Sequence, residues 1–194
     1  MKFEYPDGAT PIDSDETAGL LLPHISTKAE LDRWEQDNIN EADMWAEKYR
    51  RKDIITITFI RRLHKEMFKN VWQWAGKFRK SDKNIGVPWH QITQNLRALC
   101  DDTNYWINNS TYKTDEVAWR FHYRLVFIHP FPNGNGRHSR LMADLILIKI
   151  YNKSRFTWGS ENLAKPSECR KRYIEALRSA DRNDFSFLKD FVRS

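Results

Sequence analysis

The chain has 194 residues, of which 40% are hydrophobic and 13% aromatic, so it can bury the core of one globular domain and is not a disordered chain. No apolar run approaches the roughly 20 residues of a membrane span, and the N-terminus lacks the basic and apolar regions of a signal peptide. Two cysteines argue against a disulfide framework and favour a bacterial-type cytoplasmic protein.

The net charge of +6 is unevenly distributed, because residues 1–48 carry −8 and residues 49–194 carry +14. An acidic N-terminal arm on a basic body is expected to fold back on it, although a solvated acidic helix face would give the same pattern. Nucleic acid is an unlikely partner, since the basic clusters fall on predicted helix faces without aromatic residues between them. These clusters are Arg50-Arg51-Lys52, Arg61-Arg62 and Arg170-Lys171-Arg172.

The first half of the chain predicts an irregular arm followed by two helices. Prolines and glycines interrupt residues 1–26, which predicts an extension with short turns. Thr27 and Glu30 have the spacing of a capping box, which predicts that a helix over 27–49 begins there. A second helical pattern covers 54–69. Residues 77–88 break this period and suit a small β-hairpin between glycines and a proline.

The second half predicts further helices. Apolar spacing from Ile92 to Trp106 indicates a third helix, and a fourth is capped near Thr114 with acidic residues in its first turn. Another helix begins at Arg137, while Pro166 and Asp184 are expected to open the last two. The expected fold is therefore all-α, a compact helical bundle with one hairpin.

Residues 129–140, His-Pro-Phe-Pro-Asn-Gly-Asn-Gly-Arg-His-Ser-Arg, combine a base, a glycine turn and two arginines. Gly134-Asn135-Gly136 can expose successive amides before a helix N-terminus, the geometry of an anion-binding nest. Arg137 and Arg140 can reach one face, which suits a di- or triphosphate. His129 can accept a proton near neutral pH. The combination predicts transfer of a phosphorus-containing group to a hydroxyl.

Each of these features has an ordinary structural interpretation. A glycine turn between two helices is common, and a single histidine is more often structural than catalytic. His122 lies two turns before His129 on the same helix, but the sequence lacks the spacing of a zinc site, so His122 is expected to be buried or to support the site. It is the combination within twelve residues that favours a functional interpretation.

The segment resembles the signature of the Fic (Fido) family, His-x-Phe-x-Asp/Glu-Gly-Asn-Gly-Arg-x-x-Arg, and departs from it only at Asn133. The runs 63–68 and 71–79 resemble the family's segment leading into its flap. More narrowly, the chain is similar to a branch called mobile mystery protein B, which is associated with mobile elements and a helix-turn-helix partner encoded nearby. The pieces similar to that branch are residues 8–11, 34–36, 82–88, the His129 motif and 156–159.

The resemblance implies a Fic domain over 27–194 that transfers AMP from ATP to a Ser, Thr or Tyr hydroxyl of a target protein. It implies that His129 deprotonates the hydroxyl and that the nest binds the α-phosphate and diphosphate. Arg137 would hold the outgoing phosphates and Arg140 the γ-phosphate, while Phe131 would anchor the loop in the core.

The expected hairpin is the flap that would pair main chain to main chain with the target and align its hydroxyl. An ordinary surface hairpin is the alternative. The residues assigned to target docking are Lys80, Ser81, Asp82, Lys83, Asn84, Ile85 and Gly86.

Asn133 stands where the family's acidic residue binds Mg²⁺, so it is a weak candidate ligand. Weaker metal binding, a different nucleotide or low activity are the expected consequences. Gly136 argues against direct phosphorylation, because the family's kinase branch carries lysine there. A nucleotide-binding module with little chemistry is therefore the main alternative to a toxin-like AMP-transferring enzyme.

Many members of the family are inhibited by a helix whose glutamate pairs with the second motif arginine. Residues 34–38 loosely resemble that inhibitory sequence. Glu35 is therefore expected to pair with Arg140 and inhibit the enzyme, with Glu41 as the alternative. A solvent-facing glutamate on a charged helix would be the structural interpretation.

Overall fold

The computed structural model describes residues 17–50, 53–160, 163 and 167–194. Within those ranges no strand is formed, and the only β-pairing is an isolated antiparallel bridge between Leu20 and Trp72. The expected all-α class is confirmed. No helix in this described part is long and apolar enough to cross a membrane. The α-helices are α2 (Lys28–Lys48), α3 (Ile57–Phe68), α4 (Ile92–Asn108), α5 (Thr114–Ile128), α6 (Asn135–Lys149), α7 (Glu168–Ala180) and α8 (Ser186–Phe191), and two short 3-10 helices are η1 (Trp89–Gln91) and η2 (Trp158–Ser160).

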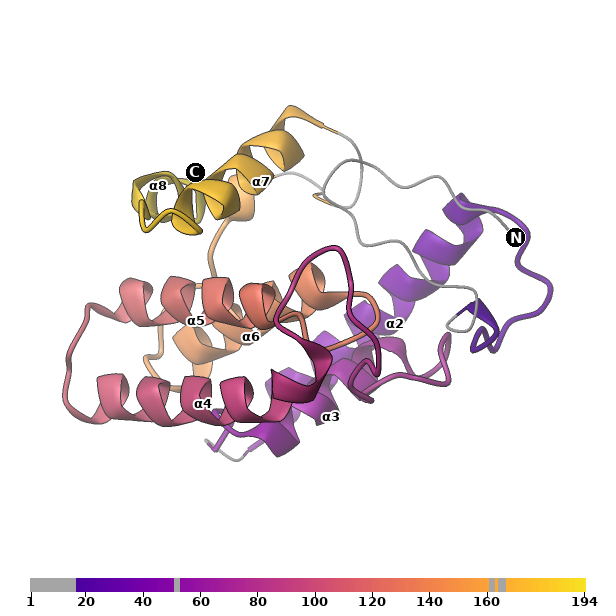
Figure 1. Cartoon of the computed structure of the whole chain (residues 1–194), viewed down its shortest axis with the longest axis horizontal. Helices are drawn as coiled ribbons and strands as arrows, with labels where there is room; N and C mark the ends of the chain where they lie inside the picture. Colours follow the sequence, from indigo (N-terminus) through magenta and orange to yellow (C-terminus); the bar gives the residue numbers. More distant parts are fainter. Residues whose placement is uncertain (1–16, 51–52, 161–162, 164–166) are drawn as a thin grey trace.

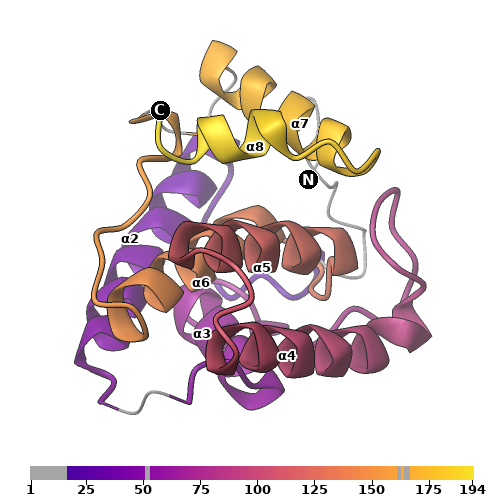
Figure 2. The same cartoon turned by 90° about the vertical axis from the view of Figure 1, so that its left-hand side faces the viewer.

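Helices α5 and α6 form the centre of the molecule (Figures 1 and 2). They pack along each other, α4 packs against α5, and α2 pairs with α3. Helices α7 and α8 form a separate pair across α5 from α4. Ten of the 15 residues of α6 are buried, so this helix is enclosed on most of its circumference. The motif of residues 129–140 thus connects the two central helices.

The local signals place several helix ends correctly. Thr27 Oγ1 accepts a hydrogen bond from Glu30 N at 3.2 Å, and Glu30 Oε2 accepts from Thr27 N at 3.1 Å, which completes the predicted capping box. At α8 the residue in the cap position is Phe185, one position after the predicted Asp184, and Asp184 Oδ1 accepts from Ser186 N at the start of that helix. The proposed signal at Pro166 and the arm before residue 17 lie outside the described residues.

The β-hairpin expected over 77–88 is not formed, because these residues make a loop without strand pairing. The physical reason is Arg79, whose side chain is buried within the loop. Its guanidinium donates to Ser81 O at 2.9 Å and to Val87 O. A buried cation therefore satisfies carbonyls that a partner strand would satisfy in a hairpin.

Four buried histidines make the stability of the fold dependent on pH. Burial lowers the pKa of His122 and His138 to about 3 and, together with the Arg79 cation, that of His129 to about 4. The pKa of His64 also lies well below its ordinary value because of burial. The unfolded chain binds protons first as pH falls through about 6.5, so these groups stabilise the fold above that pH and progressively less below it.

We expect the melting temperature to fall between pH 7 and pH 5, with each such histidine contributing at most about 1.4 kcal/mol per pH unit. Asp144 offsets part of this loss of stability, because burial raises the pKa of its carboxyl to about 6. Below that pH the folded chain takes up a proton at Asp144 before the unfolded chain does, which favours the fold. Thermal unfolding across this pH range measures the slope. His122→Gln should reduce the slope of melting temperature against pH, whereas His90→Gln, at an exposed position, should leave it unchanged. A melting temperature that stays constant from pH 7 to pH 5 would contradict the prediction.

Candidate active site

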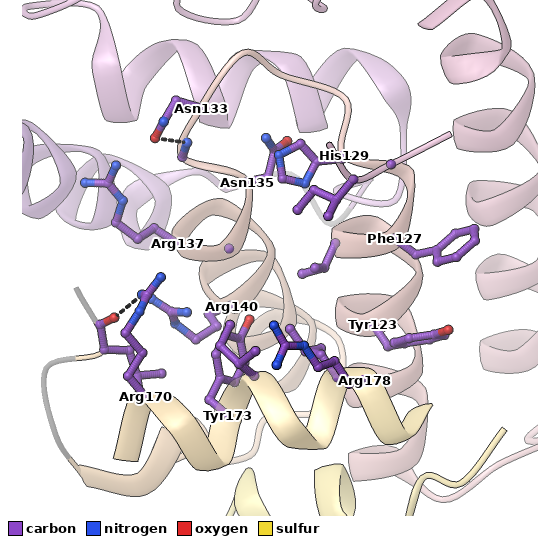
Figure 3. A pocket seen from close by; sticks show the side chains of 18 of the residues that line it. Tyr123, Phe127, His129, Asn133, Asn135, Arg137, Arg140, Arg170, Tyr173 and Arg178 are labelled. Carbon is purple, nitrogen blue, oxygen red and sulfur yellow. Dashed lines mark hydrogen bonds between the residues drawn. The ribbon is translucent and has the colours of Figure 1, made fainter. Parts of the chain in front are cut away.

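A cavity of about 450 Å³ lies where α2, the end of α5, the start of α6 and α7 meet (Figure 3). It collects every residue of the predicted nest, both motif arginines and His129. Residues far from the motif in sequence complete its walls, among them Glu35, Ile85, Tyr173 and Asp181, together with Tyr123 and Phe127 of the preceding helix α5. The sequence motif therefore corresponds to a real concave site.

The motif loop (residues 129–136) is held by its own side chains. Asn135 Oδ1 accepts from Phe131 N at 2.9 Å, and Asn135 Nδ2 donates to Phe131 O at 2.8 Å. Phe131 is fully buried, as expected for an anchor. Gly134 has φ +77°, and a Cβ there would lie 2.4 Å from the Phe68 ring. Only glycine fits this turn, which begins α6 at Asn135, two residues earlier than predicted.

His64 supports the loop from the core side, a role that the sequence reasoning missed. Its Nδ1 accepts from Gly76 N at 3.0 Å, which leaves the proton on Nε2 to donate to Asn133 O at 3.0 Å. The ring also stacks on Phe131, with 3.7 Å between ring centroids. The one available signal was the position of His64 within the run 63–68, on the apolar face of a helix.

His129 directly follows α5 as its C-cap, with φ 53° in the left-handed region, and 5% of its surface is exposed. Burial is the main cause that lowers its pKa to about 4, and the Arg79 and Lys83 cations lower it further. The imidazole is consequently neutral at pH 7. A neutral imidazole on the wall of a cavity can accept a proton from a hydroxyl.

The two motif arginines are directed to different walls of the cavity (Figure 3). Arg137 reaches toward α2, where its Nη1 lies 2.7 Å from Glu35 Oε2. Arg140 turns toward α7, where its guanidinium lies 5.3 Å from the centre of the Tyr173 ring. Arg170 of α7 also lines the cavity and donates to Leu163 O at 2.6 Å. Cationic side chains thus face the nest from two sides.

Glu35 pairs with Arg137 and not with Arg140, which corrects the expected pairing. Its carboxylate is 3% exposed and also accepts from Trp72 Nε1 at 2.6 Å. Glu35 belongs to the buried stripe of α2 that faces α3, and this stripe meets the first turn of α6. The alternative, Glu41, is exposed and accepts from Asn70 Nδ2 at 3.2 Å.

The far end of the cavity carries apolar and aromatic side chains beside the charged Arg178 and Asp181 (Figure 3). Helix α5 contributes Tyr123 and Phe127, and α7 contributes Ile174 and Leu177. Asp181 borders the same end and accepts from the Tyr123 hydroxyl at 3.0 Å. Such a surface can hold a planar ring. The motif gives no signal for Ile174 and Leu177, because these α7 positions follow it by more than thirty residues.

The donor set does not fit Mg²⁺, which prefers carboxylate oxygens. Asn133 offers only an amide, and its Oδ1 accepts from Gly134 N at 2.7 Å. The described residues contain no cluster of three or more His, Cys, Asp or Glu side chains suited to a metal. The cavity's carboxylates are already engaged: Asp32 by Lys28, Glu35 by Arg137 and Asp181 by Tyr123.

Comparison with known proteins agrees with this geometry. The family model of the Fic/DOC family matches residues 54–147. The protein adenylyltransferase Fic of Drosophila melanogaster is 31% identical over 143 residues, which are 72% of this chain and 27% of that protein. This chain therefore spans about a quarter of the length of the curated relatives it matches.

Two solved structures share the fold. The N-terminal Fic domain of a Bep effector from Bartonella quintana has a TM-score of 0.70 and 18% identity, over 98% of this chain and 90% of that one. BepC from Bartonella tribocorum, with bound AMPPNP, has a TM-score of 0.67 and 17% identity, over 87% of each chain. From its signature loop, its helical fold and the family model matched from α3 into α6, the chain belongs to the Fic/DOC family.

Proposed function

We propose that this chain is a protein adenylyltransferase that moves AMP from ATP to a Ser, Thr or Tyr hydroxyl of a target protein. The observation that carries the proposal is that His129, the nest and both motif arginines line one cavity. Relatives named protein adenylyltransferase and a neighbour with bound AMPPNP support it. A toxin-like role, and a helix-turn-helix partner of the kind associated with the mobile mystery protein B branch, stay predictions.

The triphosphate would lie across the N-terminus of α6, where free amides and the helix dipole favour anions. The nest would bind the α-phosphate, while Arg137 and Arg140 would hold the β- and γ-phosphates. The target hydroxyl oxygen attacks the α-phosphorus as His129 accepts the hydroxyl proton. The bond between the α-phosphorus and the bridging oxygen breaks, and diphosphate leaves with that oxygen. Because the donor set does not fit Mg²⁺, arginine charge balances the phosphates in this scheme.

Labelled ATP tests the proposal directly. The chain is incubated with a bacterial lysate and either α-labelled or γ-labelled ATP, and label retained on protein is measured. Retention from the α position alone is the expected result, because only AMP is transferred. Retention from the γ position would show a kinase. ATP binding without retained label from either position would favour the nucleotide-binding module instead.

Regulation by Glu35 belongs to the same proposal. Its carboxylate forms an ion pair with the guanidinium of Arg137. A nucleotide phosphate must therefore displace the carboxylate of Glu35 to bind this arginine. Trp72 is 1% exposed and holds the other carboxylate oxygen, which fixes Glu35 in this position. The chain is therefore proposed to rest in an inhibited state. The arginine that Glu35 blocks is Arg137, whereas Arg140 was expected from the sequence.

The substitution Asn133→Asp is expected to make transfer respond to Mg²⁺. Aspartate can keep the hydrogen bond from Gly134 N while adding a negative charge beside the nest, which is the kind of ligand Mg²⁺ prefers. We expect transfer by Asn133→Asp to rise with Mg²⁺ and to fall in EDTA, and wild-type transfer to persist in EDTA. Metal titrations of transfer compare the two proteins; superimposable curves would contradict this assignment of Asn133.

The loop over Lys80 to Gly86 remains the proposed docking element for the target. Ile85 and Gly86 line the cavity beside His129, and 42% of the Ile85 surface is exposed. An extended target segment could bind along this loop through main-chain hydrogen bonds. The absence of a preformed hairpin within the loop means that such pairing would form only with the target present.

A further inference from the structure

Arg79 connects the loop of residues 80–87 to the candidate base. It is 2% exposed, and its Nε donates to His129 O at 2.7 Å. Its Nη2 donates to Val87 O and, at 3.4 Å, to Ile128 O, while Nη1 donates to Ser81 O at 2.9 Å. One guanidinium thus joins both ends of the loop to the main chain of His129.

The main chain repeats this connection. Arg79 N donates to Pro130 O at 3.0 Å, so the residue contacts three consecutive carbonyls, those of residues 128, 129 and 130. The last carbonyls of a helix lack partners within the helix and favour a nearby cation. Arginine can satisfy several of them at once because its donors diverge in a plane, whereas a lysine ammonium cannot reach the same set.

Gly86 brings the loop into contact with the same histidine. Its φ is +102°, and a Cβ at this position would lie 2.6 Å from His129 Cβ and 2.9 Å from Arg79 Nη2. Glycine is required both by the backbone conformation and by this close approach. A displacement of the loop toward His129 at Gly86 would therefore meet the His129 side chain directly.

We propose that Arg79 is a positioning residue that couples the loop of residues 80–87 to His129, so that docking of the target on the loop sets the position of the imidazole. The proposal rests on the AMP transfer proposed above. The carbonyls that Arg79 contacts belong to the loop and to residues 128–130, which places it on the target side of the reaction. We therefore expect a change at Arg79 to act on kcat and little on ATP binding.

The test compares Arg79→Lys with Arg61→Lys. Arg61 lies on α3, and its Nε donates to Gly76 O at 3.1 Å. It binds a main-chain carbonyl just before Arg79 but lies exposed and away from His129, so it serves as the control. Arg79→Lys is expected to lower kcat for target modification about a hundredfold, as a misplacement near 1 Å can do. The Kd and KM for ATP should stay within about twofold, and Arg61→Lys should change none of these values. A kcat unchanged in Arg79→Lys would overturn the proposal.

A second readout does not depend on activity. Hydrogen exchange of residues 80–88 and 126–132 should accelerate together in Arg79→Lys and in neither region in Arg61→Lys. If exchange becomes faster in residues 80–88 but not in residues 126–132, the coupling is refuted, even if the wild-type protein transfers no AMP. If exchange becomes faster in both regions but the wild-type protein transfers no AMP, the proposed function is contradicted and the coupling is supported. If Arg79→Lys does not fold, Gly86→Ala perturbs the same contact from the loop side. We expect this variant to lower kcat and to keep its affinity for ATP. An unchanged kcat would again overturn the proposal.

Discussion

Replacing His129 with alanine is expected to lower the rate of AMP transfer by a factor of about 10² to 10⁴, the usual contribution of a general base. The imidazole is removed from the cavity wall while the nest and Arg140 keep their positions, so ATP affinity should change little. Single-turnover transfer from α-labelled ATP, with ATP binding measured by calorimetry, separates the two effects.

The pH dependence gives a further check on the same residue. Since the pKa of His129 is lowered to about 4, its neutral form predominates from pH 7 down to about pH 5. The wild-type rate should therefore show no loss centred at pH 6.5, where an ordinary histidine would become protonated. His90→Ala, at an exposed position, is the matched control. Transfer by His129→Ala at more than about a tenth of the wild-type rate would exclude His129 as the base.

Replacing Glu35 with glutamine is expected to raise AMP transfer by roughly tenfold to a hundredfold. Hydrogen bonds to charged groups contribute about 1.5–3 kcal/mol, which corresponds to such factors in affinity. Glutamine can still accept from Trp72 Nε1 but brings no charge to Arg137. The guanidinium then becomes available to the nucleotide phosphates, so the Kd for ATP should fall together with the rise in transfer.

Glu41→Gln provides the control on the same helix, because Glu41 contacts Asn70 and not a motif arginine. It should leave transfer and ATP affinity unchanged. A fall in transfer in Glu35→Gln would show that Glu35 supports the reaction instead of inhibiting it. No change in either variant would mean that the contact with Arg137 does not limit the enzyme.

The sequence predicted those parts of the molecule that depend on short spacings. The capping box at Thr27, the left-handed turn at Gly134 and the burial of Phe131 each follow from residues within a few positions of one another. The loop at 77–88 was misassigned because its conformation depends on carbonyls of residues 128–130, some fifty positions away from Arg79. No local pattern of glycines and prolines contains that information.

The predicted partner of Glu35 was wrong for a related reason. The resemblance to the family's inhibitory sequence predicted that a glutamate on the first long helix approaches the motif, but the choice between Arg137 and Arg140 depends on how α2 crosses α6. One helical turn separates the two arginines, so a small difference in crossing decides the pair. The α7 wall of the cavity was invisible for the same reason, since tertiary packing alone brings Tyr173 and Leu177 to the motif.

The burial of α6 has a consequence for selectivity. The first amides of this helix form part of the nest, and a helix enclosed by its neighbours cannot tilt to meet a ligand. Its dipoles are therefore oriented before any phosphate arrives, and little reorganisation is needed on binding. Such a rigid receptor discriminates by shape, and a ligand whose phosphates are spaced differently gains no compensation from movement of the protein.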